Sequence, residues 1–93
     1  MSHWHPGRVV LFKENSNSRL KRFFAGCEVI WVIAFHNSFV YLKLKRASQG
    51  DLVIRCHQDD MALYFTEKMF HDEMPYVNGP FRDTKIFPDE FFF

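Results

Sequence analysis

Aromatic rings and positive charges alternate along two segments that lie close together in the sequence. The residues concerned are Phe39, Tyr41, Lys43, Lys45, Arg55 and His57. Alternate residues of a β-strand lie on one face, so these six share a sheet face if both segments are strands. Rings that stack on bases, interleaved with cations that follow phosphates, are typical of single-stranded nucleic-acid binders. We call this set the ring-and-cation face. It either binds nucleic acid, or a helix covers it and the lysine stems extend past the helix edge.

The C-terminal sequence PDEFFF forms a second candidate site. Three successive phenylalanines are costly to leave in water, so we expect them to pack on the protein itself, across a dimer, or against a partner. Acidic residues followed by terminal phenylalanine resemble the tips of bacterial single-stranded-DNA-binding proteins, and the likeness covers only residues 89–93. This resemblance implies recruitment of another protein. The candidate partner residues are Phe87, Phe91, Phe92 and Phe93.

The sequence predicts no metal, no cofactor and no catalytic residue. Structural zinc sites pair their ligands at tight spacing, such as C-x2-C, and no such pair is present. His3 and His5 form the one close pair of histidines, and we expect them to lie on a flexible terminus. The sequence also lacks G-x-S-x-G, a Walker loop, H-E-x-x-H and a dinucleotide fingerprint. A non-enzymatic protein is therefore the leading interpretation.

One enzymatic alternative stays open. Four residues of the ring-and-cation face are of the types that small ribonuclease toxins place on a sheet face, namely Tyr41, Lys43, Arg55 and His57. The resemblance is one of residue type alone. That toxin architecture usually places a longer helical segment before its sheet than residues 14–27 allow.

The composition is that of a small folded domain. The 93 residues are 47% hydrophobic and include twelve phenylalanines, which is too apolar for a disordered chain. A chain of this length buries only about 60–65% of the surface of its unfolded form. We therefore expect some rings to be exposed and to contact a partner or a second copy.

The charges are divided unevenly along the chain. Residues 1–46 contain eight Lys or Arg and two acidic residues, whereas residues 47–93 contain four Lys or Arg and nine acidic residues. This asymmetry is compatible with a basic binding surface and with ion pairing between the two halves. We favour pairing between the halves.

The longest uncharged segment, Val29–Leu42, does not predict a membrane span. A transmembrane helix needs about 20 apolar residues, and this segment is interrupted by the turn residues His36-Asn37-Ser38. The first ten residues lack the apolar centre of a secretion signal. We therefore expect a cytoplasmic protein without a membrane partner. Cys27 and Cys56 are expected to be free, mostly buried thiols, and a disulfide stays open if their strands are neighbours.

Secondary-structure signals predict a strand over Arg8–Lys13 and a helix over Ser18–Gly26, with Ser18 as its N-cap. The uncharged segment predicts a hairpin with a turn at Asn37-Ser38, because its flanks are rich in β-branched and aromatic residues. Pairing across this turn predicts one core face, made of Trp31, Ile33, Phe35, Val40, Leu42 and Leu44.

A third hairpin strand is expected over Leu52–His57, after a three-residue turn Ser48–Gly50 with a left-handed glycine. This strand adds Ile54 and Cys56 to the core face. A second helix is expected over Gln58–Met74, with Asp59 as its N-cap. A strand over Ala62–Thr66 is the alternative.

These elements predict an α+β fold with an antiparallel three- to four-stranded meander sheet packed with two short helices. We expect a single compact domain over residues 1–93, in which residues 76–93 form an extended aromatic and acidic tail that packs on the body or on a second subunit. The leading interpretation is a small non-enzymatic interaction protein, homodimeric or bound to a protein partner through exposed aromatic surface. The alternatives are a single-stranded RNA or DNA binder that uses the ring-and-cation face, and a small ribonuclease toxin.

Overall fold

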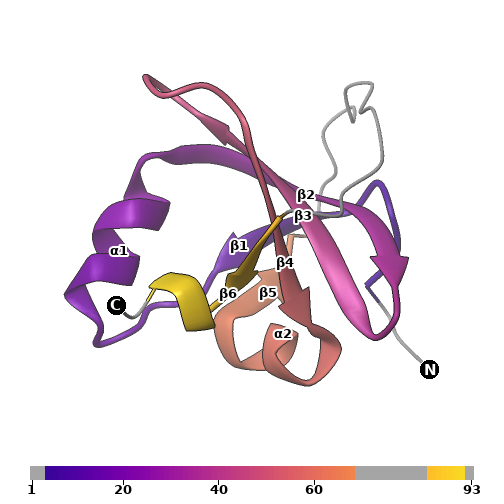
Figure 1. The fold of residues 1–93 in the computed structure, drawn as a ribbon. Coiled ribbons are helices and arrows are strands. Elements are labelled where there is room, and N and C mark those ends of the chain that lie inside the picture. The colour runs from indigo at the N-terminus through magenta and orange to yellow at the C-terminus, as the bar shows by residue number, and fades with distance from the viewer. Residues whose placement is uncertain (1–3, 69–83, 92–93) are drawn as a thin grey trace.

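The computed structural model describes residues 4–68 and 84–91. Six strands and two α-helices follow one another along this part of the chain (Figure 1). In order they are β1 (Val9–Phe12), α1 (Ser18–Ala25), β2 (Cys27–His36), β3 (Phe39–Arg46), β4 (Leu52–His57), α2 (Gln58–Tyr64), β5 (Phe65–Glu67) and β6 (Lys85–Phe87), followed by the short 3-10 helix η1 (Asp89–Phe91). The α+β class expected from the sequence is confirmed.

The sheet is larger than the predicted meander. Its strand order is β5-β1-β2-β3-β4-β6, with antiparallel pairing throughout except for the parallel pair β4 and β6. The predicted meander is present as β2, β3 and β4. The edge strand β6 was missed, and β5 was foreseen only in the alternative strand over Ala62–Thr66, because each edge strand has three residues, too few for an alternating pattern to appear.

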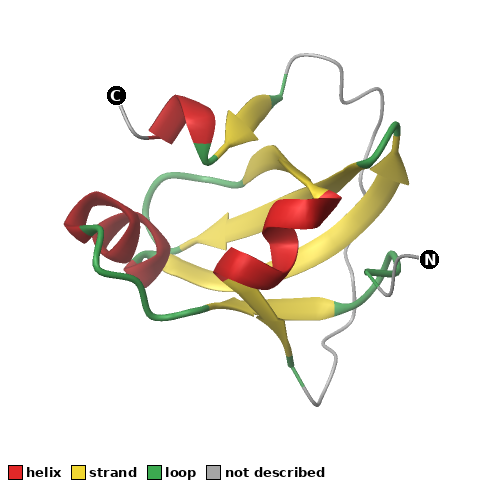
Figure 2. Cartoon of the chain, turned by 90° about the horizontal axis from the view of Figure 1, so that it is seen from below, coloured by secondary structure: helices red, strands yellow, loops and turns green. Residues whose placement is uncertain are grey.

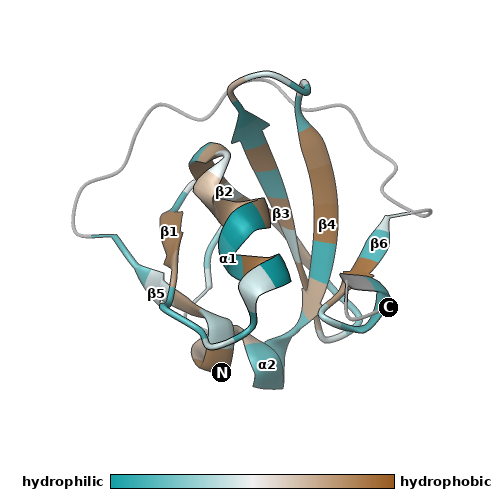
Figure 3. Ribbon diagram, turned by 90° about the vertical axis from the view of Figure 1, so that its left-hand side faces the viewer, coloured by the Kyte–Doolittle hydropathy of each residue, from teal (hydrophilic) through white to brown (hydrophobic). Residues whose placement is uncertain are grey.

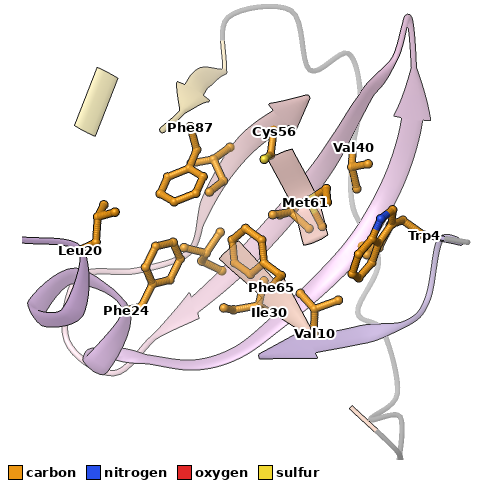
Figure 4. Close-up of a cluster of buried hydrophobic side chains, with 14 residues drawn as sticks. Trp4, Val10, Leu20, Phe24, Ile30, Val40, Cys56, Met61, Phe65 and Phe87 are labelled. Carbon is orange, nitrogen blue, oxygen red and sulfur yellow. The ribbon is translucent and has the colours of Figure 1, made fainter. Parts of the chain in front are cut away.

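The sheet curves around one hydrophobic core. Figure 3 shows α1 in front of the curved sheet, with β1 and β5 on one side and β4 and β6 on the other. Four rings from four elements meet inside: Phe12 stacks on Phe24 with ring centroids 4.2 Å apart, and Phe65 and Phe87 lie 5.6 Å apart. Because Phe65 and Phe87 belong to the two edge strands, this contact joins the edges across the core (Figure 4).

The first hairpin has the predicted turn but a different register. Asn37 and Ser38 have φ of +51° and +67°, and Phe35 pairs with Val40 as predicted. A bulge between Val32 and Ala34 then adds one residue to β2, so that Val32 rather than Ile33 pairs with Leu42. One extra residue reverses the alternation of side chains.

The bulge makes the predicted core face of β2 wrong. The core side chains of this strand are Ile30 and Val32, at 5% and 0% exposure, whereas Phe35 is 41% exposed. Trp31 turns to the opposite face of the sheet, where it is buried outside that core cluster. The predicted core residues of β3 are confirmed: Val40, Leu42 and Leu44 are fully buried.

The second hairpin turn is longer than predicted. The strands end at Arg46 and resume at Leu52, and Leu44 pairs with Leu52 rather than with Ile54. Because the register differs by two residues, the faces are unchanged. Ile54 and Cys56 lie in the core as predicted, and Gly50 has the expected left-handed conformation, with φ +74°.

Both helices begin or end differently from the prediction. The side chain of Asn17, not Ser18, caps α1 by accepting hydrogen bonds from the backbone N–H groups of Arg19 and Leu20. The imidazole of His57, not Asp59, caps α2. Helix α2 ends at Tyr64, and strand β5 begins at the next residue, Phe65. The prediction of a long helix is therefore wrong, and the alternative of a strand is partly confirmed. Residues 69–74 of the predicted helix lie outside the described part of the chain.

The described helices are short, as Figure 2 shows for α1 and α2. None of the helices within residues 4–68 and 84–91 has the length and apolar character needed to cross a membrane. Several described phenylalanines, namely Phe12, Phe23, Phe24, Phe65 and Phe87, lie in the protein's own core or pack against it. The exposed large apolar side chains of the described part are Leu11, Phe35 and Leu63.

We expect Phe87→Ala to destabilise the protein by about 3–5 kcal/mol, because it removes a fully buried ring and leaves a cavity between the two sheet edges. Urea denaturation followed by tryptophan fluorescence measures this change. The matched control is Phe35→Ala, which removes an exposed ring and is expected to cost less than about 1 kcal/mol. Equal effects of the two substitutions would show that Phe87 is not a core residue.

We expect Ser38→Gly to raise the free energy of unfolding by about 1 kcal/mol. Ser38 has φ +67°, a conformation that disfavours residues with a Cβ atom and favours glycine at this position of a two-residue hairpin turn. The same denaturation experiment measures the gain. Ser48→Gly, in the second turn, serves as the control and is expected to give no gain. A loss of stability in Ser38→Gly would contradict the turn assignment.

Candidate functional site

The structure places the ring-and-cation face on β3 and β4. Phe39 pairs with His57 and Tyr41 pairs with Arg55, while Lys43 lies two residues further along β3. Since cross-strand partners share a face, the residues are brought together as expected. Helix α1 does not cover them, because its buried residues Leu20 and Phe24 pack in the core on the other side of the sheet.

The charges and rings of this face are largely occupied by the protein's own residues. The ammonium of Lys43 lies 3.4 Å from an Asp51 carboxylate oxygen, and the Lys43 side chain is only 13% exposed. The ammonium of Lys45 lies 3.8 Å from Glu28. Tyr41 is 7% exposed, so its ring offers little surface for a base to stack on.

Phe39 is enclosed by its two neighbours on β4. The guanidinium carbon of Arg55 lies 5.0 Å from the centroid of the Phe39 ring, within range of a cation–π contact. The His57 ring meets Phe39 edge-on at 5.5 Å, and its Nδ1 accepts a hydrogen bond from the Asp59 N–H at the start of α2. Two donors on this side of the sheet, Nε1 of Trp31 and Nε of Arg55, are buried without a hydrogen-bond partner among residues 4–68 and 84–91.

The second predicted site, the C-terminal tail, is described only in part. Residues 85–87 form β6, which pairs with residues 54–56 of β4. Phe87 is fully buried in the protein's own core, so it is not available to an external partner in this structure. The side chains of Phe91, Phe92 and Phe93 lie outside the described part of the chain.

A different basic site lies where α1 meets the turn between β3 and β4. A hollow of about 360 Å³ is lined there by Arg19, Arg22, Phe23, Gly26, Arg46, Ser48 and Gln49. Pairing of Cys27 with Arg46 and a hydrogen bond from the Ala47 N–H to the Gly26 carbonyl hold the helix end against the turn. Three of the seven lining residues are arginines, and none is acidic. We call this site the arginine hollow.

The guanidinium of Arg46 is held rigidly within the arginine hollow. It donates from Nε to the Gly50 carbonyl at 2.8 Å, and from its two terminal nitrogens to the side chain and carbonyl of Gln49 at 3.0 and 2.9 Å. A guanidinium has five N–H donors, so two remain for another acceptor. Among the described residues, no ion pair involves Arg19 or Arg22. The hollow is therefore suited to an anion.

Sequence analysis missed the arginine hollow. Arg19 and Arg22 are three residues apart on one helix face, and this spacing was visible in the sequence. Arg46 joins them only because the hairpin returns its strand to the end of α1, which depends on the pairing of residues 27 and 46. No local spacing signals such a contact.

The two cysteines are free thiols. Burial raises the pKa of Cys56 to about 12, and the nearby carboxylates of Asp60 and Asp89 add to the rise. Burial also raises the pKa of Cys27, which Arg46 partly offsets. Both groups are therefore neutral thiols at pH 7 and poor nucleophiles.

Within the described ranges, no three His, Cys, Asp or Glu side chains are grouped closely enough to hold a metal ion.

We expect the protein to lose stability above pH 9. The pKa of Cys56 is 9.0 in the unfolded chain and about 12 in the folded one, so the folded form retains its proton over this range. Above pH 9 the Cys56 thiol loses its proton in the unfolded chain only, which favours unfolding. The free energy of unfolding therefore falls by about 1.4 kcal/mol per pH unit over this range. Burial also raises the pKa of Tyr64, which acts in the same direction.

Urea denaturation between pH 7 and pH 11 measures this loss, and Cys56→Ala is the control. The control variant lacks the thiol and is expected to lose less stability over the same range. A wild-type slope equal to that of Cys56→Ala would contradict the assignment.

Comparisons with protein-family models, with curated proteins and with solved structures find no match for this chain. No relative therefore supplies a function for any of these residues. The two basic sites have to be judged by their own geometry. In the ring-and-cation face both lysines are paired with carboxylates. In the arginine hollow, two of the three arginines have no ion pair with the described residues.

Proposed function

We propose that this protein is a non-enzymatic binding protein that holds single-stranded nucleic acid at the arginine hollow. The observation that carries the proposal is a concave site with three arginines and no acidic lining residue. Arginine forms bidentate hydrogen bonds with phosphate and is suited to backbone contacts with RNA and DNA.

The surroundings of the arginine hollow support an extended anion rather than a single ion. Arg19 and Arg22 lie three residues apart on one face of α1, beside Arg46, and have no ion pair in the described part of the chain. The helix carries no acidic residue in its first turn. These cations lie in the N-terminal half of the chain, where basic residues are in excess. A run of phosphates can contact several of them at once.

Phe23 gives the hollow an aromatic wall. Its ring is half-buried and meets the Phe24 ring edge-on, with centroids 4.9 Å apart. A ring held this way at the edge of a basic hollow can stack on a base, as in other single-strand binders. The ring-and-cation face supports the same function less well, because Tyr41 is buried and Lys43 and Lys45 are paired.

A homodimer or a protein partner held through exposed aromatic surface receives less support from the described residues. Leu11, Phe35 and Leu63 are exposed by 49%, 41% and 65%. They belong to three different elements, and single exposed apolar residues are common on soluble proteins. Function by exposed aromatic surface therefore rests on Phe35 alone in this part of the chain.

Fluorescence anisotropy with labelled 12-nucleotide single-stranded RNA and DNA tests the proposal. We expect binding that weakens steeply as salt rises, with log K falling by about 0.7 per phosphate contacted. Replacement of Arg19 and Arg22 by alanine is expected to weaken binding at least tenfold and to reduce the salt slope by about 1.4, the share of two contacts. Both side chains are exposed, so the fold is expected to be retained.

The matched control replaces Lys43 and Lys45 with alanine and is expected to change affinity less than threefold. If this pair abolishes binding while the arginine pair does not, the ring-and-cation face is the site and the arginine hollow is not. No binding to either oligonucleotide at low salt would contradict the proposed function.

A further inference from the structure

A second hollow lies within the sheet itself, between β1 and β2. It has a volume of about 420 Å³ and is lined by every residue of β1, Val9–Phe12, and by the first four residues of β2, Cys27–Ile30. Consecutive residues of a strand point to opposite faces. The hollow is lined by consecutive residues of both strands, so it reaches past their last paired residues, Val10 and Ile30, to the place where the two strands separate. We call it the strand gap.

The backbone pairing shows where the strands separate. β1 and β2 pair at Val9 with Trp31 and at Val10 with Ile30, and the described ladder ends there. The Val32 N–H donates to the Arg8 carbonyl at 2.8 Å, so Arg8 directs its backbone toward β2. Backbone direction alternates with the side chains. Phe12, four residues further on, therefore directs its N–H and C=O into the strand gap.

Helix α1 explains why the strands separate. The chain leaves β1 at Phe12, forms α1, and returns as β2 at Cys27. The ring of Phe24, near the helix end, stacks on Phe12 at 4.2 Å with the rings 13° from parallel. The register of β2 is irregular between Cys27 and Val29. This packing holds the start of β2 away from the end of β1.

The lining defines the chemistry of a ligand. Val10, Phe24 and Ile30, which are 1%, 6% and 5% exposed, form an apolar floor. The charged lining residues are two acids and two bases, Glu14, Glu28, Lys21 and Lys68. Their charges balance, so the strand gap does not select a strongly charged ligand, unlike the arginine hollow.

We propose that the strand gap binds a short extended peptide segment of a protein partner, uncharged at its centre and carrying an apolar side chain. An extended peptide supplies alternating N–H and C=O groups, which satisfy an open strand edge, while its apolar side chain occupies the floor. Beyond the last paired residues, β1 offers Leu11 and Phe12, and β2 offers Cys27–Val29, so about two to three residues of the segment, rising about 3.3 Å per residue, lie along the unpaired stretch.

A metal ion is not the occupant that this geometry favours. Cys27, Glu14 and Glu28 all line the hollow, but no three such ligands of the described chain are close enough to hold one. The Cys27 thiol is half-buried and donates toward the Phe23 carbonyl at 3.7 Å, which orients it toward α1.

Panning of a phage library of random heptapeptides against the full-length protein tests the proposal. We expect enrichment of uncharged sequences with apolar residues at alternate positions. In 1H–15N spectra, a selected peptide is expected to shift the amides of Phe12, Glu28 and Val29 and to slow the hydrogen exchange of Phe12. N-methylation of the peptide backbone is expected to abolish binding only at every second residue. Only every second N–H group of the peptide faces the open edge of β1.

The variant Ala25→Trp is designed to block the mouth of the strand gap, where Ala25 is exposed at the end of α1. We expect it to weaken peptide binding at least tenfold. Ala62→Trp places the same exposed substitution on α2, outside the hollow, and is expected to leave binding within twofold of wild type. Failure of the library to enrich any peptide, shifts that map elsewhere, or equal effects of the two variants would overturn the proposal.

Discussion

The contact between Phe65 and Phe87 is the interaction on which the rest of the structure depends. β5 and β6 are the two edges of the sheet, and their rings meet 5.6 Å apart inside it. Each ring also contacts Phe24 of α1, at 5.6 and 5.3 Å. A sheet whose edges meet across its own core has to curve, and the helix that completes the ring cluster has to lie against its concave side. The two pairs with Phe24 are edge-on, and such aromatic pairs add about 0.5–1.5 kcal/mol each beyond the area they bury.

The placement of α1 then determines both hollows. Its last turn, held by the stack of Phe24 on Phe12, separates the start of β2 from the end of β1 and opens the strand gap. The same helix end lies against the turn between β3 and β4, where Arg46 joins Arg19 and Arg22. One packing interaction therefore creates an electropositive site and a neutral one on adjoining sides of a single helix.

Sequence reasoning succeeded where structure depends on local alternation and failed where it depends on register. The turn at Asn37-Ser38 and the faces of β3 and β4 followed from side-chain period and turn chemistry. The bulge at Ile33 had no local signal, because Val32 and Ile33 are equally apolar and either fits a core position. A single extra residue moved Trp31 out of the predicted core and brought Ile30 and Val32 into it.

The candidate sites show the same limit. The ring-and-cation face was assembled correctly, because alternation along β3 and β4 decides which side chains share a face. Whether its cations are available depends on Glu28 and Asp51, which approach Lys45 and Lys43 from other parts of the chain. For the arginine hollow, the sequence did not indicate which residues share a surface. Its lining residues come from a helix and from a turn at the far end of β3. A charge pattern in a sequence therefore indicates which residues share a surface, and the packing of distant elements decides which of them stay available to a ligand.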